Sequence, residues 1–283
     1  MKHFVLLSLL AFFSGFQVRA QQSKAKEIDN LALKKHTGGK VLNQFEVSVV
    51  YDKPGITPSA LLQPNPFFKL IDSMTVTMPD SQRKEMEVQM LETKKEMFQD
   101  LDELYADTKE IYYIDETAKL NARIVIRPNP ARGKPDTTRQ IYSLEKENSF
   151  SYDLNVNPVS LLRLMSADTS KLHYTGIITF ENVDYKVVQV QVGAIWWDVY
   201  FDSKSGMVNN LIIPQVDKDP LVGNGPVYFK DINCYRSFKK YGDFLLPDKI
   251  EKIETRQEFT LRKQLSWTNI NKSFPASVFA PEP

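Results

Sequence analysis

Alternation of apolar and polar residues dominates the last third of this chain, from about Tyr174 to Trp267. Its clearest part is the run Ile195–Phe201, followed by the turn Asp202–Gly206 and then by the run Met207–Ile213. Strict alternation places successive side chains on opposite faces of a strand, and turn signals recur about every ten to fourteen residues. The pattern predicts a large antiparallel sheet, curved or partly closed, with few helices.

The rest of the chain carries both helix and strand signals. A helix is expected over residues 24–37 from the helical spacing of Ile28, Leu31, Ala32 and Leu33, and Gly38-Gly39 offers a left-handed C-cap where it ends. A long helix over residues 81–107 has an apolar stripe at helical period, and Asn157-Pro158 starts a short helix as N-cap and first residue. The expected strands are 41–51, 68–78, 121–127, 140–144, 149–154, 172–181, 186–192, 195–201, 207–213, 227–238, 244–254 and 258–269.

The first twenty residues have the layout of a secretory signal peptide. A short polar start precedes an apolar run from Phe4 to Phe16, and Val18-Arg19-Ala20 supplies a cleavage site. The run is about a dozen residues long, and a membrane-spanning helix needs ~20. We therefore expect residues 1–20 to be removed, and residues 21–283 to form a single domain in the periplasm or outside the cell.

The charge balance argues against nucleic acid or an anionic membrane as a partner. The chain has 36 basic and 35 acidic residues, and residues 1–20 hold two of the basic ones. The remaining 34 basic and 35 acidic residues give a net charge of −1, whereas such partners need a basic patch. After residue 20 no apolar run is long enough to span a membrane, and no cysteine follows the cleavage point to carry a lipid.

Residue types that carry catalysis are sparse. His36 and His173 are the histidines that follow residue 20; they lack metal-ligand spacing, so each is expected to be a surface or cap histidine. No Gly-x-Ser-x-Gly elbow accompanies them. Cys234, the only cysteine, lies inside an expected strand, which favours a buried, inert thiol over a nucleophile. We predict no enzymatic activity, no metal site and no cofactor.

Carboxylate chemistry is the remaining alternative. Asp217 and Asp219 lack the spacing of an EF-hand loop and favour a solvated loop. Glu181 and Asp184 flank a tight turn, where a glycosidase pair would lack the cleft that it needs. A hydrolase that uses other carboxylates stays open as a third hypothesis.

The aromatic strand 195–201 offers two different faces. One face carries Ile195, Trp197, Val199 and Phe201, and the other carries Trp196, Asp198 and Tyr200. The first set either packs under the long helix as core, or lines a groove between the curved sheet and that helix which takes acyl chains. On the second interpretation the ligand-binding residues are Trp197, Val199, Phe201, Val188, Val190 and Met90.

Four segments together resemble a known family: Ala32–Gly39, Asp198–Asp202, Tyr241–Pro247, and the ending from Asn269 through Phe274–Pro281. In this order, around a strand meander, they are similar to the LolA/LolB superfamily of periplasmic lipoprotein carriers, whose wider group includes sensor domains such as RseB/MucB. The resemblance implies an α+β fold in which a strongly curved antiparallel sheet, an unclosed half-barrel, is lidded by a few helices and shelters acyl chains. The helix over residues 81–107 would then be an insertion in this single domain.

Two functions follow as expectations. The first is an exported, non-catalytic binding protein that shelters a lipid, an acylated peptide or protein, or another apolar ligand in the half-barrel. The second is an envelope interaction or sensor module that binds a partner protein. Neither function involves nucleic acid.

Overall fold

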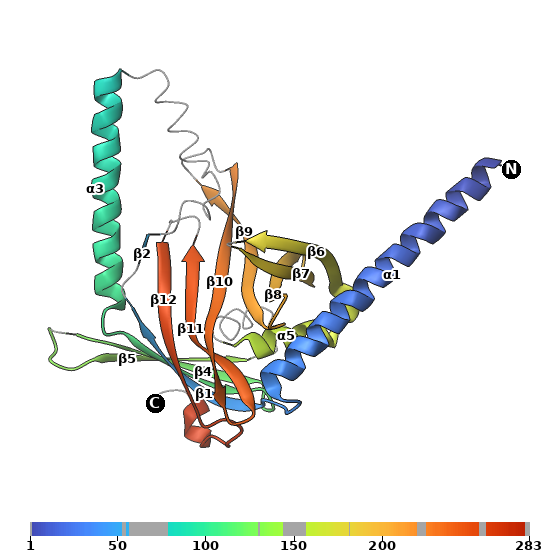
Figure 1. Cartoon of the computed structure of the whole chain (residues 1–283). Helices are drawn as coiled ribbons and strands as arrows, with labels where there is room; N and C mark the ends of the chain where they lie inside the picture. Colours follow the sequence, from blue (N-terminus) through green and yellow to red (C-terminus); the bar gives the residue numbers. More distant parts are fainter. Residues whose placement is uncertain are drawn as a thin grey trace.

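One antiparallel sheet forms the body of the protein (Figure 1). This computed structural model describes residues 2–52, 55–56, 79–129, 131–143, 157–180, 182–219, 225–254 and 259–280. The strands lie in the order β5-β4-β3-β1-β12-β11-β10-β9-β8-β7-β6, and β2 pairs with β12 beside this path. Since β5 and β6 end the order and do not pair with each other, the sheet of the described residues is not closed. The expected α+β fold, an unclosed antiparallel half-barrel with a few helices, is confirmed.

The strands are β1 Gln44–Tyr51, β2 Gly55–Ile56, β3 Lys109–Asp115, β4 Leu120–Arg127, β5 Asp136–Ser143, β6 Leu172–Phe180, β7 Val183–Val192, β8 Ile195–Asp202, β9 Val208–Asp219, β10 Gly225–Tyr241, β11 Phe244–Glu254 and β12 Phe259–Thr268. The helices are α1 Lys2–Thr37, α3 Asp80–Tyr105 and α5 Pro158–Ala167, with short 3₁₀ turns η3 Thr169–Lys171 and η5 Ala276–Phe279. The expected strands 68–78 and 149–154 lie outside the described residues.

From β6 to β12 the strands follow one another in space as they do along the chain, as a meander of hairpins. The β8–β9 turn is fixed by Asp202, whose Oδ1 accepts hydrogen bonds from the backbone N–H of Lys204 at 3.0 Å and of Ser205 at 2.5 Å. Gly206 then takes a φ of 68°, which favours glycine. The alternation seen in the sequence therefore sets the pleat of β8, and the turn chemistry sets where the strand ends.

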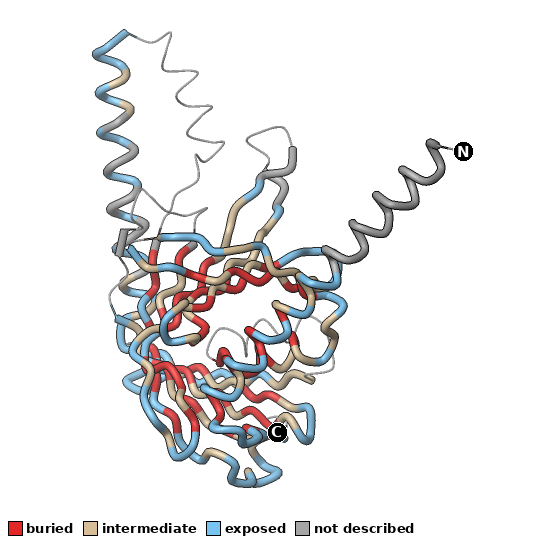
Figure 2. Tube along the Cα trace, turned by 45° about the vertical axis from the view of Figure 1, so that its right-hand side comes forward, coloured by how far each residue is buried: buried red, intermediate tan, exposed pale blue. Residues whose placement is uncertain are grey.

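Two helices cover one face of the sheet, here called the helix-covered face. Helix α1 contributes Ala25, Ile28 and Ala32, whose spacing places them on one side of the helix, and all three are buried in the core cluster. The helix stops at Gly38, with a φ of 59°. Helix α5 begins as expected: Asn157 Oδ1 accepts from the backbone N–H of Val159 at 3.0 Å. Figure 2 shows the buried residues concentrated along the central strands and the facing helix turns.

The long helix α3 does not cover the sheet. Figure 1 shows it projecting from the body, and Figure 2 shows exposed residues along its length. Val88 and Leu104 are 55% and 44% exposed, and a ring contact of 4.6 Å joins Tyr105 at its end to Tyr51 of β1. The aromatic face of β8 was expected to pack under this helix, but in the described residues it packs with α1 and α5 instead. The apolar stripe of α3 shows that the helix is amphipathic, but a stripe does not specify which surface the helix meets.

Candidate functional site

The face of β8 that the sequence singled out lies in the centre of the core. Trp197, Val199 and Phe201 are buried there, and the register places Val190 opposite Trp197 and Val188 opposite Val199. They share one cluster with the buried residues of α1 and α5. The structure thus brings the strand members of the predicted site together, and helices cover them. Met90 lies on α3, and its side chain is outside the described residues.

A pocket lies on the other face of the same strands, and we call it the β6–β12 pocket. Its volume is about 210 Å³. It is lined by Ile178, Phe180, Tyr200, Asn210, Ile212, Ile232, Cys234, Arg236, Glu251, Ile253, Thr260 and Arg262. Because β6 and β12 lie far apart in the strand order and both line the pocket, the sheet curls around it.

Strand register explains which residues line the pocket. Directly paired residues in adjacent strands share a face, and the pairings run Tyr200–Asn210–Cys234–Glu251–Arg262 across β8 to β12. A neighbouring row pairs Ile212, Ile232, Ile253 and Thr260 in the same way. The two rows differ in chemistry, since the second is almost wholly apolar and the first carries the charged Glu251 and Arg262; Arg236 pairs with Lys249 and lies in neither row.

Exposure separates the floor of the pocket from its mouth. Ile232, Cys234 and Ile253 are buried and pack with Ile212 as a small apolar cluster of their own. By contrast, the side chain of Arg262 is 46% exposed, and Ile178 of the edge strand is equally open. The pocket therefore has an apolar floor and a mouth that meets solvent.

Three charged residues stand at this mouth. Arg262 Nε lies 3.1 Å from Glu251 Oε1, and Arg236 Nε lies 4.0 Å from Glu251 Oε2. Nη1 of Arg236 also donates to the backbone oxygens of Asn209 and Tyr235, each at 3.2 Å, and to Asn210 Oδ1 at 3.0 Å. Arg236 is thus fixed by hydrogen bonds to neighbouring strand residues, whereas the side chain of Arg262 is held by Glu251 alone among the described residues.

A buried carboxyl group joins the two covering helices. Ser166 Oγ of α5 donates a hydrogen bond of 2.5 Å to Asp29 Oδ2 of α1. Asp29 Oδ1 has no hydrogen-bond partner among the described residues. Burial raises the pKa of Asp29 to about 7, and the bond from Ser166 offsets part of that shift. The contact between α1 and α5 therefore contains a group whose charge changes near neutral pH.

His36 is a core residue, and the expectation of a surface or cap histidine is corrected. Its Nδ1 lies 2.9 Å from the carbonyl oxygen of Leu245, and its Nε2 accepts from the backbone N–H of Val208 at 3.3 Å. Burial lowers the pKa of His36 to about 4, so the ring is neutral at pH 7. It ties the end of α1 to β9 and β11, and this role left no recognisable pattern in the sequence.

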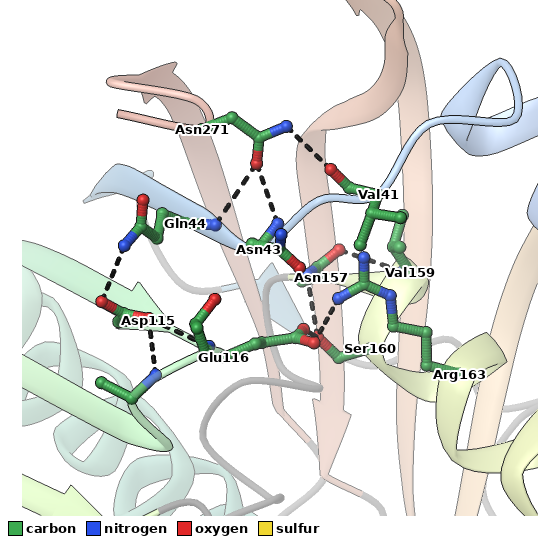
Figure 3. A network of polar contacts seen from close by, with 12 residues as sticks. Val41, Asn43, Gln44, Asp115, Glu116, Asn157, Val159, Ser160, Arg163 and Asn271 are labelled. Atoms are coloured by element: carbon green, nitrogen blue, oxygen red, sulfur yellow. Dashed lines mark hydrogen bonds and ion pairs between the residues drawn. The ribbon is translucent and has the colours of Figure 1, made fainter. Parts of the chain in front are cut away.

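A network of polar contacts fixes α5 and the C-terminal segment at the start of β1 (Figure 3). Ser160 Oγ donates to Glu116 Oε1 at 3.0 Å, and Arg163 forms an ion pair with the same carboxylate. Asn271 donates from Nδ2 to the carbonyl oxygen of Val41 at 2.7 Å and accepts from the backbone N–H of Asn43 at 2.8 Å. The contacts with Glu116 hold α5 in place, and those of Asn271 hold the C-terminal segment against the start of β1.

A cluster on β3 and β4 resembles an acid–base site in composition, but its carboxylate is paired on both oxygens. Glu110 is buried, accepting from Arg123 Nη2 and from the Tyr112 hydroxyl, each at 2.5 Å. Burial, the largest single effect, would raise the pKa of Glu110, but the hydrogen bonds from Arg123 and Tyr112 and the charges of Arg123 and Lys263 together outweigh burial and hold that pKa below its usual value. An ionised, paired carboxylate suits structural support better than general acid catalysis.

Metal-ion clusters and membrane-spanning helices are both absent from the described residues. These residues contain no group of three His, Cys, Asp or Glu side chains arranged to hold a metal ion. Within the same part of the chain, no helix has the length and apolar character needed to cross a membrane. Cys234 forms no disulfide and is buried in the pocket floor.

Sequence reasoning missed the pocket as a unit. Residue alternation predicted that Tyr200 lies on the face of β8 opposite Trp197, and that Cys234 lies in a strand. Nothing in a single strand shows that Asn210, Cys234 and Glu251 share a row, because that depends on pairing between strands. The available signal was a set of charged residues inside otherwise apolar strands.

Comparison with known proteins bears on the fold. No protein-family model matches this sequence, and no curated protein does. The chain is similar to a solved LolA superfamily protein from Nitrosomonas europaea, with 11% identity over 91% of this chain and 97% of that one and a TM-score of 0.44. It is also similar to a DUF1329 family protein from Desulfovibrio piger (6% identity, 93% and 97% covered, TM-score 0.40).

A third similar structure is an outer membrane lipoprotein-sorting protein domain from Vibrio parahaemolyticus (7% identity, 91% and 97% covered, TM-score 0.38). The unclosed half-barrel expected from the sequence is confirmed by the open strand order of the described sheet and by its covering helices.

Proposed function

We propose that this protein is an exported binding protein, without catalysis of its own, whose apolar ligand occupies the β6–β12 pocket. The observation that carries the proposal is an apolar floor of buried residues beneath an open, polar mouth. Binding sites for small molecules commonly combine an apolar lining with a few placed polar groups. A lipid, or the acyl chain of a modified peptide, fits this chemistry.

The pocket volume limits what enters. At about 30 Å³ for each water-sized unit, a volume of about 210 Å³ holds roughly seven such units. This suits a medium-length alkyl chain or the end of a longer one. Burying seven methylenes contributes about 6 kcal/mol gross at ~0.8 kcal/mol each, before the costs of ordering the ligand.

The helix-covered face stays a second, untested location for ligand. Trp197, Val199, Phe201, Val188 and Val190 would meet a ligand only after α1 and α5 leave the sheet. The bond between Ser166 and Asp29 joins these two helices to each other, so it persists if they move as a unit and breaks if they separate. A place for Met90 in that site stays a prediction from the sequence.

Native mass spectrometry of protein purified without detergent tests the proposal. We expect a discrete bound mass in the acyl-lipid range, which Cys234→Trp removes because the indole fills the floor. Cys234→Ser is the matched control and should keep the mass, and urea unfolding should show that both variants fold. A bound mass that survives Cys234→Trp would place the ligand elsewhere. A wild-type protein that carries no ligand and takes up no octanoate or octanol would overturn the proposal.

A partner-binding module is the second candidate, and the edge strand β6 favours it. β6 pairs only with β7 in the described sheet, and Ile177 is 61% exposed. An unpaired edge with exposed apolar residues can accept an extended strand from a partner. An envelope complex that is lost with Ile177→Asp, while octanoate binding persists, would favour this function.

A further inference from the structure

The mouth of the pocket carries a net positive charge. Arg236, Glu251 and Arg262 are the charged residues that line the pocket, and together they sum to +1. One carboxylate thus stands between two guanidinium groups, with its oxygens directed to one nitrogen of each arginine. A single glutamate cannot use all the N–H groups that two arginines present.

Several of these donors have no acceptor among the residues that the structure describes. Nε of Arg262 meets Glu251, but its terminal nitrogens form no hydrogen bond with any described residue. In Arg236 the three acceptors all use Nη1, which leaves Nη2 without an acceptor in the described part of the chain. The anchored Arg236 is therefore preorganised, because its side chain is already ordered before a ligand binds and binding loses little further conformational entropy.

We infer that the ligand of this pocket is a monoanionic amphiphile, a medium-chain fatty acid whose carboxylate is bound by Arg262 and Arg236 at the mouth. The inference rests on the proposed function, because it assigns the head group of the ligand whose chain the pocket holds. Guanidinium groups bind carboxylates through paired N–H donors. The alkyl chain then lies along Ile212, Ile232 and Ile253, in the row beside the charged one.

Glu251 has two effects in this arrangement. It holds Arg262 in place through the 3.1 Å contact, and it reduces the charge of the mouth from +2 to +1. The remaining charge matches one carboxylate. A neutral alcohol of equal length would keep the apolar contacts and lose the ionic ones, and an alkylammonium would be repelled.

Calorimetric titration with octanoate, octanol and octylammonium tests the inference, because the three share one chain and differ in the head. We expect the wild-type protein to bind octanoate about tenfold tighter than octanol, and octylammonium most weakly. Arg262→Gln should bring octanoate to within about threefold of octanol, because only octanoate loses an ionic contact. Glu251→Gln should strengthen octanoate binding by about threefold, an effect that a purely structural Glu251 would not produce.

Arg132→Gln is the matched control. Arg132 is an exposed arginine in the turn between β4 and β5, paired with Asp136, so its loss should change none of the three affinities. Equal binding of octanoate and octanol by wild type and Arg262→Gln would overturn this inference and leave the pocket proposal standing. Binding of none of the three probes would instead overturn the proposed function. Octylammonium binding tightest would contradict the assigned charge.

Discussion

The two faces of β8 arise from one alternating sequence, but one face is packed in the core and the other lines a pocket. On one face Trp197, Val199 and Phe201 pack against α1 and α5 and have almost no contact with water. On the other face Tyr200 lines a pocket whose mouth is charged. The comparison shows that an apolar strand face indicates burial but does not say by what. A covering helix makes one face core, and the curl of the sheet makes the other a pocket.

The largest effect is expected from a cavity on the helix-covered face. Phe201→Ala removes a fully buried ring, and the space that it leaves is closed in by strands and helices. We expect the free energy of unfolding to fall by about 3–5 kcal/mol in urea titrations. The variant should still bind octanoate at low temperature. A loss below about 1 kcal/mol would mean that this face is not packed as described.

A pH effect should identify the contact between the covering helices. The pKa of Asp29 is raised to about 7 in the folded protein, so the folded state holds a proton that the unfolded chain has already lost above pH 4. Stability from this group is therefore present at low pH and is lost as pH rises through 7. Between pH 5 and 8 Asp29 alone contributes a loss of roughly 2–3 kcal/mol, which is the expected difference in pH dependence between the wild-type protein and Asp29→Asn. An unchanged slope in the variant would contradict the burial of this carboxyl group.

His36 should act in the opposite direction. Its folded-state pKa is lowered to about 4, so the ring stays neutral in the folded protein at pH values where it is protonated in the unfolded chain. The resulting stability is present above pH 6.5 and is lost as pH falls toward 4, by about 2 kcal/mol between pH 7 and 5. The wild-type curve would then be flat where the two effects cancel. His36→Gln should leave the Asp29 slope alone and visible, and a still-flat curve would show that one of the two groups is exposed.

The smallest effect on stability is expected at the mouth of the pocket. Ile178 is 46% exposed on an edge strand, so Ile178→Ser should change the free energy of unfolding by less than about 0.5 kcal/mol. Because the residue lines the pocket, octanol affinity should still fall by about threefold. Thermal unfolding and calorimetry on the same sample separate the two effects. A large loss of stability would mean that β6 is packed more tightly than its exposure indicates.

Local patterns predicted the local structure. The β8–β9 hairpin, the stop of α1 at Gly38-Gly39 and the start of α5 at Asn157 all appear where the sequence placed them. Each depends on residues adjacent in the chain: alternation, a glycine with positive φ, or a side chain that caps the next turn.

Contacts between distant segments were not predictable in this way. The apolar stripe of α3 predicted the helix but not its position. Helix α1, and not α3, packs on the aromatic face of β8. His36 contacts Val208 and Leu245, which lie far from it in the chain. The pocket depends on a row that crosses β8 to β12, and a register shift of one residue would move every member to the other face.

The thiol of Cys234 permits the most direct test of the central claim, that ligand binds on the uncovered face. It is the only cysteine in the chain and lies in the pocket floor. Iodoacetamide should alkylate the Cys234 thiol about tenfold more slowly when octanoate is present at ten times the dissociation constant of octanoate, because the bound ligand shields the thiol. An unchanged rate, measured while calorimetry shows octanoate bound, would place the ligand outside this pocket and contradict the account.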